Sequence, residues 1–178
     1  VLEKSSGRRQ ALHLPVFGDH HVANALLAIA VARGHQVDWP DIALALDRFK
    51  LQPMRWERVQ VGGLTFINDA YNANPMSMRA AVDALAHTPT SGRKWLVLGG
   101  MLELGRIAEY AHRELGQMVA RQAVDSLVTV GELGERIAAG AVDGGFREDR
   151  MHCCGDSAEA AEVLAAKCRS GDTILLKA

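Results

Sequence analysis

A short apolar strand, a polar turn and the start of a helix follow one another in the segment Phe66-Ile67-Asn68-Asp69-Ala70-Tyr71-Asn72-Ala73-Asn74-Pro75. Asp69 stands where the strand ends, and Asn74 before Pro75 is a favourable pair for the cap and first turn of a helix. In an open α/β sheet, ligands bind at the carboxyl ends of the strands. This turn is therefore the first candidate for a binding site.

The same alternation of strand and helix continues after this segment. Downstream we expect helices at 75–86, 107–122, 133–141 and 157–168, and strands at 94–98, 126–130, 151–153 and 173–176. Upstream, residues 58–61 and 64–68 flank Gly62-Gly63, which is typical of a hairpin. Short apolar strands that alternate with helices predict an α/β fold with a mainly parallel sheet covered on both faces.

The residues before the hairpin follow a different pattern. Helices are expected at 20–33 and 39–49, with Asp38 as the cap of the second. The first of them is apolar on nearly every side, which predicts a buried helix whose partner lies upstream of this sequence. We place a domain boundary near Gln52-Pro53, so that 1–52 is the tail of one domain and 53–178 is an α/β domain.

Composition narrows the class of protein. The chain has 178 residues, of which 48% are hydrophobic and 23% charged, with a formal net charge of -1. These values are typical of a globular protein, and the scattered Lys and Arg residues argue against a nucleic-acid partner. No apolar run is long enough to cross a bilayer. The odd count of three cysteines, two of them adjacent, favours a reducing cytoplasm and offers no zinc-ligand spacing.

Within the polar turn, a carboxylate at Asp69 can accept hydrogen bonds from ribose hydroxyls, and Asn72 can both donate and accept. The alternative is that the asparagines only stabilise the turn and cap the helix, and for Asn74 we favour that alternative. A second turn, 98–105, is rich in glycine, but the chain has no phosphate-binding loop of the G-x-x-x-x-G-K-[ST] type. We interpret Glu103 and His112 beside it as structural.

Two further segments carry polar residues. His20 and Asn24 are four positions apart on one face of the expected helix at 20–33, but the sequence places no third ligand that would complete a metal site. Arg55 can clamp a phosphate, although an exposed pair with Glu57 is the more ordinary role for such a residue.

Taken in order, these segments resemble the motifs of the Mur ligase family. The matching residues are Gly18, His20 and Asn24, Arg55 and Glu57, Asn68 to Pro75 with Ser77, Leu98 to Gly105, His112, and Gly171 to Lys177. The resemblance covers almost the whole chain. The strings at 68–75 and 98–105 resemble those of the subgroup that joins D-alanyl-D-alanine to a UDP-N-acetylmuramoyl tripeptide.

The resemblance implies an ATP-dependent ligase of three domains that forms an acyl phosphate and then an amide in peptidoglycan precursor synthesis. Residues 1–52 would end the central ATP-binding domain, and 53–178 would be a Rossmann-like C-terminal domain lacking its last residues. ATP and magnesium would be held mainly by parts of the enzyme outside this sequence. The fragment alone, which by this resemblance carries no catalytic residue, would be inactive.

The same resemblance implies binding roles for individual residues. Asn24 and His21 would lie near the adenine and phosphates of ATP, Arg55 would reach its phosphates, and Asp69 would bind its ribose. The dipeptide-binding residues would be Tyr71, Asn72 and Asn74. His21 stands where the family has Asn, and Gly100 stands where it has Asp.

Other interpretations remain open at this point. The chain could belong to another Mur-type ligase or to a ligase of the folylpolyglutamate type, although the string at 69–75 argues against both. It could also be a stand-alone binding domain without catalytic activity. The apolar helix at 20–33 distinguishes that last alternative, because an independent domain would not leave it exposed.

Overall fold

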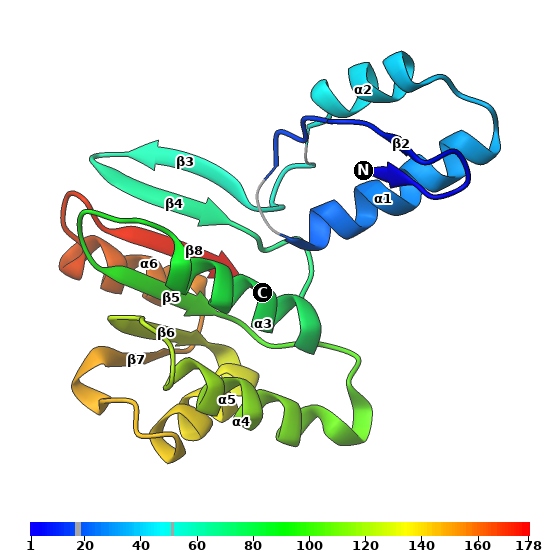
Figure 1. Cartoon of the computed structure of the whole chain (residues 1–178). Helices are drawn as coiled ribbons and strands as arrows, with labels where there is room; N and C mark the ends of the chain where they lie inside the picture. Colours follow the sequence, from blue (N-terminus) through cyan, green and yellow to red (C-terminus); the bar gives the residue numbers. More distant parts are fainter. Residues whose placement is uncertain (17–18, 51) are drawn as a thin grey trace. The chain divides into compact units, whose positions relative to one another are not determined.

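The computed structural model describes residues 1–16, 19–50 and 52–178, without the side chains of Asp19 and His20. The chain divides into two compact units, Val1–Gln52 and Pro53–Ala178. Figure 1 labels the elements of both units.

The first unit is built around a small apolar core. Strands β1 (Leu2–Glu3) and β2 (Arg8–Arg9) form a short antiparallel hairpin that the sequence did not predict. They are followed by helices α1 (Asp19–Gly34) and α2 (Trp39–Asp47). The core consists of three buried side chains, Ile29, Trp39 and Ile42.

Helix α1 exposes most of its apolar side chains. Among its described residues only Ile29 is buried, while Val22, Leu26, Leu27 and Val31 are exposed, Leu27 by 69%. The burial expected from the sequence is therefore not achieved within this unit. In α2, Asp38 occupies the cap position as expected, but its side chain makes no capping hydrogen bond.

The second unit contains a six-stranded sheet with the order β3-β4-β8-β5-β6-β7. Only the β3–β4 hairpin is antiparallel, and the other neighbouring pairs are parallel. This confirms the predicted α/β fold with a mainly parallel sheet. The strands are β3 (Glu57–Val61), β4 (Leu64–Asn68), β5 (Lys94–Leu98), β6 (Ser126–Val130), β7 (Met151–Cys154) and β8 (Thr173–Lys177).

Helices cover both faces of the sheet because successive strand residues point to opposite sides. Leu96 and Leu98 pack with the helices on one face, whereas Trp95 and Val97 pack on the other. The first face is covered by α3 (Pro75–His87), α4 (Ala108–Val119) and α5 (Gly131–Asp143), and the second by α6 (Ser157–Lys167).

Several element boundaries differ from the predicted ones by one to three residues. Helix α4 is shorter than the expected 107–122, because a 3-10 turn, Gly105–Ile107, takes its first residue and the helix already ends at Val119. Helix α5 begins at Gly131 instead of residue 133. Strand β8 continues through Lys177, which is buried although it is charged. The last difference matters most, because it brings Lys177 to the polar turn.

Candidate functional site

A buried lysine fixes the turn between β4 and α3. Lys177 ends β8, and its side chain is only 3% exposed. Its ammonium group donates hydrogen bonds to the backbone oxygens of Asp69, at 3.0 Å, and Asn72, at 2.7 Å. It also lies 3.0 Å from Asp69 Oδ2. The three N–H donors of the lysine therefore each have an acceptor, and all three acceptors belong to this one turn.

The carboxylate of Asp69 is held from both sides and remains partly exposed. Its Oδ1 accepts a hydrogen bond of 3.2 Å from the backbone N–H of Trp56, while Oδ2 pairs with Lys177. A carboxylate has about four acceptor positions, so two partners leave positions for further donors. Asp69 is thus oriented by the fold and can still accept hydrogen bonds from a ligand.

The segment around Arg55 lies against this turn with an unusual backbone. Met54 and Trp56, on either side of Arg55, have φ values of 60° and 54°, a region that costs free energy for residues other than glycine. The backbone N–H of Tyr71 donates to Met54 O at 3.2 Å, which joins the segment to the turn. Such strain is found where a function requires a particular geometry.

Arg55 does not form the exposed ion pair that the sequence offered as its ordinary role. The carboxylate of Glu57 instead accepts a hydrogen bond of 3.0 Å from the backbone N–H of Met54. The guanidinium of Arg55 lies over the ring of Tyr71, 4.3 Å from its centroid. Stacking of this kind holds the group through its flat face and leaves its N–H donors at the edge free to bind an anion.

Asn74 has the capping role that we favoured from the sequence. Its side-chain oxygen accepts a hydrogen bond of 2.8 Å from the N–H of Ser77, and the Ser77 hydroxyl accepts one of 3.1 Å from the N–H of Asn74. These two bonds form a capping box at the start of α3. Whether Asn74 also contacts a substrate stays a prediction.

We expect Asn74→Ala to destabilise the chain by about 1 kcal/mol, because the first turn of α3 loses its side-chain acceptor. Denaturant unfolding followed by circular dichroism measures this change. Asp38→Ala is the control, since Asp38 occupies a cap position without a capping hydrogen bond and should change stability much less. Equal effects of the two substitutions would contradict the prediction.

Tyr71 and Asn72 line a pocket at the carboxyl edge of the sheet, called the carboxyl-edge pocket below. It has a volume of about 460 Å³, within the range of small-molecule sites. Three turns that follow three strands enclose it, and its main side chains and glycines are Tyr71, Asn72, Gly100, Leu102, Glu132 and Leu133. The sequence analysis identified the first two turns but missed the third, at the start of α5. That turn also follows the carboxyl end of a strand, so the same rule could have indicated it.

The glycine-rich turn is held by His112, which is fully buried. The backbone N–H of Met101 donates to His112 Nε2 at 2.9 Å, and His112 Nδ1 lies 2.6 Å from Ala108 O. A neutral imidazole with its proton on Nδ1 satisfies both contacts. His112 is therefore structural, as the sequence analysis proposed.

Gly100 has no room for a side chain. A Cβ atom placed there would lie 2.6 Å from Leu133 Cβ, far inside van der Waals contact. Leu133 belongs to the first turn of α5, so neither backbone can easily move away. The absence of a side chain at Gly100 is thus matched to the leucine at 133.

We expect Gly100→Asp to destabilise this chain by about 1–3 kcal/mol through overpacking against Leu133. Thermal unfolding measures the loss. The double variant Gly100→Asp/Leu133→Ala provides the control, because the smaller side chain frees the space and should recover part of the stability. A double variant with no recovery would show that the contact with Leu133 is not the cause.

His21 and Asn24 lie on α1 in the first unit, three positions apart. His21 is half-buried and Asn24 is exposed. Gly18 is outside the described residues, and the side chain of His20 is not described, so the predicted pairing of His20 with Asn24 is not tested. The structure thus brings together Arg55, Asp69, Tyr71, Asn72 and Asn74 within one unit, and places His21 and Asn24 in the other.

Two general features of the described chain bear on its chemistry. In residues 1–16, 19–50 and 52–178, no three His, Cys, Asp or Glu side chains are grouped so that they could hold a metal ion. None of the helices in these ranges combines the length and the apolar character needed to span a membrane.

Residues 54–178 match the family model of the Mur ligase, glutamate ligase domain. The chain therefore belongs to the Mur ligase family. Within that family it is similar to proteins named UDP-N-acetylmuramoyl-tripeptide--D-alanyl-D-alanine ligase. The protein of that name from Bacillus subtilis is 37% identical over 97% of this chain, and the one from Mycobacterium bovis is 40% identical over 94%.

Solved structures give the same relationship. A crystal structure of MurF from Acinetobacter baumannii superposes with a TM-score of 0.79 at 29% identity and covers 93% of this chain. MurF from Thermotoga maritima, in complex with ADP, has a TM-score of 0.73 at 25% identity over 91%. The chain spans 38% of the Bacillus protein and 36% of the Acinetobacter chain, so it corresponds to little more than a third of these relatives.

Proposed function

We propose that this chain is part of an ATP-dependent ligase that adds D-alanyl-D-alanine to UDP-N-acetylmuramoyl-tripeptide. The observation that carries the proposal is the similarity of nearly the whole chain, both units included, to ligases that bear this name. In this proposal residues 1–52 are the end of the central ATP-binding domain, and 53–178 form the C-terminal domain. The enzyme works in the cytoplasm, and the chain alone does not turn over.

The carboxyl edge of the sheet is the face that we assign to the reaction. Asp69 would accept hydrogen bonds from the ribose hydroxyls of ATP, for which its carboxylate retains acceptor positions beside Trp56 and Lys177. Arg55 would bind the phosphates, since its guanidinium is stacked on Tyr71 and makes no hydrogen bond or ion pair within the described chain. His21 and Asn24 would lie near the adenine.

The carboxyl-edge pocket is the proposed site of the incoming dipeptide. Its volume of about 460 Å³ is sufficient for so small a molecule. Tyr71 and Asn72 would contact the dipeptide directly, and Asn74 would act mainly by holding their turn. In this proposal ATP would phosphorylate the substrate carboxylate with release of ADP. The residues of this chain would orient the amine that attacks the acyl phosphate, with release of phosphate, and would exclude water.

Magnesium would be held by residues outside the described chain. Asp69, which we place at the ribose of ATP, already has its charge compensated by Lys177. A second cation bound directly to Asp69 would therefore be unfavourable.

In the full-length enzyme we expect Arg55→Ala to raise the Michaelis constant for ATP at least about 10-fold, since each 1.4 kcal/mol of lost binding corresponds to that factor. Asp69→Asn, which keeps the shape of the side chain, should weaken ATP use in the same direction. Steady-state kinetics with ATP varied at saturating dipeptide measures both. Arg58→Ala is the matched control, because Arg58 is exposed on β3 and its side chain forms no hydrogen bond or ion pair with a described residue. A near-normal Michaelis constant for ATP in both Arg55→Ala and Asp69→Asn would contradict these assignments.

A further inference from the structure

A second cavity lies at the opposite end of the sheet, where the strands begin. It has a volume of about 480 Å³ and is lined mainly by polar side chains, among them Arg93, Ser126, Arg150, His152, Lys167 and Arg169. These residues come from the beginnings of β5, β6 and β7 and from the end of α6 and the turn after it. We call this cavity the amino-edge groove. It shares no lining residue with the carboxyl-edge pocket.

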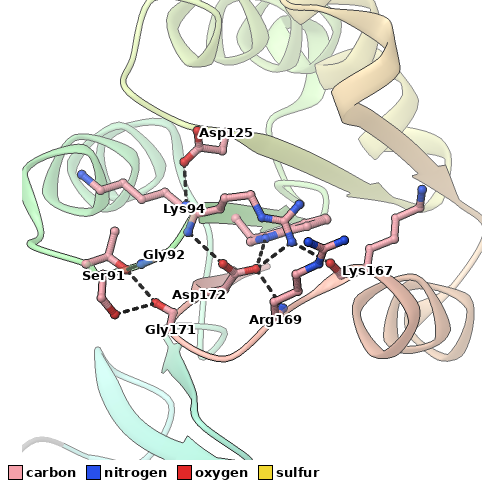
Figure 2. A network of polar contacts seen from close by, with 11 residues as sticks. Ser91, Gly92, Lys94, Asp125, Lys167, Arg169, Gly171 and Asp172 are labelled. Carbon is pink, nitrogen blue, oxygen red and sulfur yellow. Dashed lines mark hydrogen bonds and ion pairs between the residues drawn. The ribbon is translucent and has the colours of Figure 1, made fainter.

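A buried carboxylate beneath the groove, that of Asp172, already has hydrogen-bond donors around it. Asp172, beneath it, is 2% exposed and accepts four hydrogen bonds, two from Arg93, one from Trp95 Nε1 and one from the N–H of Arg169. Figure 2 shows this carboxylate surrounded by its donors, with the ammonium end of Lys167 pointing away from it.

The two acidic residues that line the groove also have partners. Asp125 Oδ2 accepts a hydrogen bond of 2.8 Å from the backbone N–H of Lys94. Asp149 is bound by both nitrogens of the Arg147 fork, at 2.9 and 2.5 Å. Asp149 is therefore paired with Arg147, which lies outside the lining, and the charge of Arg150 also acts on it. Among the described residues Asp125 has no cationic partner.

Three cationic side chains of the groove have no such partner. No side-chain hydrogen bond or ion pair joins Arg150, Lys167 or Arg169 to a described residue. Arg93 differs from them, because its guanidinium pairs with Asp172 and donates a hydrogen bond to Lys167 O. Three unpaired positive charges against one negative charge leave a concave surface of positive potential. Concave walls of low dielectric concentrate such a field, which raises the local concentration of anions.

The pKa of His152, which lines the groove, responds to the charges around it. Its ring is stacked on Trp95, with centroids 6.2 Å apart and planes inclined by 18°. Burial, together with the positive charge of Lys167, lowers the pKa of His152. Asp125, Asp149, Arg93, Arg150 and Arg169 are the other charged groups that line the same cavity. An anion bound beside Lys167 would favour protonation and raise the pKa of His152.

We propose that the amino-edge groove binds a small phosphate-bearing anion, with Arg150, Arg169 and Lys167 as its ligands. Guanidinium groups bind phosphate oxygens in a bidentate fork, and an ammonium group adds a point charge. The scarcity of apolar lining favours a small hydrophilic molecule over a protein segment, which would need an apolar centre to bind. The site is separate from the proposed ligase reaction and does not depend on it.

Titration of this chain with inorganic phosphate and, separately, with ribose 5-phosphate at constant ionic strength tests the proposal. Amide and imidazole NMR should show shifts at the groove residues, separate from any at the turn with Arg55 and Asp69, and a rise in the pKa of His152 on binding. The triple variant Arg150→Gln/Lys167→Gln/Arg169→Gln should bind at least about 10-fold more weakly. Tighter binding of ribose 5-phosphate would assign the site to a phosphorylated organic molecule, and equal binding would assign it to phosphate itself.

A matched control removes three cations elsewhere, in Arg48→Gln/Lys50→Gln/Arg106→Gln, and should bind as the unmodified chain does. Arg150→Glu alone provides a second variant in case the triple variant does not fold. Equal weakening in the groove variant and the control would overturn the proposal, because the binding would then follow net charge. Shifts spread over the whole surface, or no binding of either probe, would overturn it as well.

Discussion

Replacing Lys177 by methionine is expected to destabilise the chain by about 2–4 kcal/mol and to release the turn that carries Asp69. The substitution keeps the buried aliphatic stem but removes the ammonium group. The backbone oxygens of Asp69 and Asn72 then lose their donor, and the carboxylate of Asp69 loses its partner. Removal of one member of a buried pair leaves the other uncompensated, which is the costly case for ion pairs.

Denaturant unfolding and amide NMR of the same sample measure the two effects of Lys177→Met. We expect the free energy of unfolding to fall and the amide signals of the turn between β4 and α3 to shift or broaden. Lys50→Met is the matched control, because Lys50 is exposed and makes no contact through its side chain. If the two variants were equally stable and the amide signals of the turn were unchanged, the prediction that Lys177 holds this turn would be wrong.

The second large effect is expected at Asp172, where Asp172→Asn should destabilise the chain by about 2–4 kcal/mol at neutral pH. An amide side chain has one acceptor oxygen in place of two, and its NH₂ group would face the donors of Arg93, Trp95 and Arg169. Unsatisfied or opposed polar groups in a buried position carry most of that cost.

The same residue predicts a dependence on pH. Burial alone would raise the pKa of Asp172, but the hydrogen bonds from Arg93, Arg169 and Trp95 outweigh burial and hold the pKa below its ordinary value of 3.8. A carboxyl with a lowered pKa in the folded state binds fewer protons there than in the unfolded chain. Its contribution is therefore complete above about pH 5 and is lost as the pH falls below the ordinary value.

Unfolding measured from about pH 7 down to about pH 3 tests this sign. The difference in stability between the unmodified chain and Asp172→Asn should shrink as the solution becomes more acidic. Asp83→Asn controls for the loss of a carboxylate in the same unit, because Asp83 is exposed on α3. A stability difference that stayed constant over this range would show that the charge of Asp172 is not the source of the effect.

The mainly parallel sheet could be predicted from the sequence because its signals are local. Most of the strands are short apolar runs, and α3 and α6 begin at the capping residues Asn74 and Asp156, whose side chains accept the capping hydrogen bonds. The position of Lys177 could not be predicted in this way. A lysine after an apolar run usually marks the end of a buried strand, and only the pairing of β8 beside β4 brings it to the turn after β4.

Some features of the candidate site could also be predicted from the sequence, and others could not. Asp69, Tyr71 and Asn72 follow one strand, so the rule for the carboxyl ends of parallel strands was enough to select them. The stacking of Arg55 on Tyr71 depends on the left-handed backbone at Met54 and Trp56, for which neither residue type gives a signal. The fit between Gly100 and Leu133 joins two separate turns and becomes visible only in three dimensions.

The place of β8 in the sheet has a consequence for how the protein is made. This strand comes last among those described, yet it pairs with β4 on one side and β5 on the other. While the chain emerges from the ribosome, β4 and β5 cannot be joined until residues near Lys177 have been synthesised. The turn with Asp69 receives its anchor only after β8 has been synthesised. Until then the nascent domain exposes the unpaired edges of β4 and β5, a state that favours aggregation and engagement by chaperones.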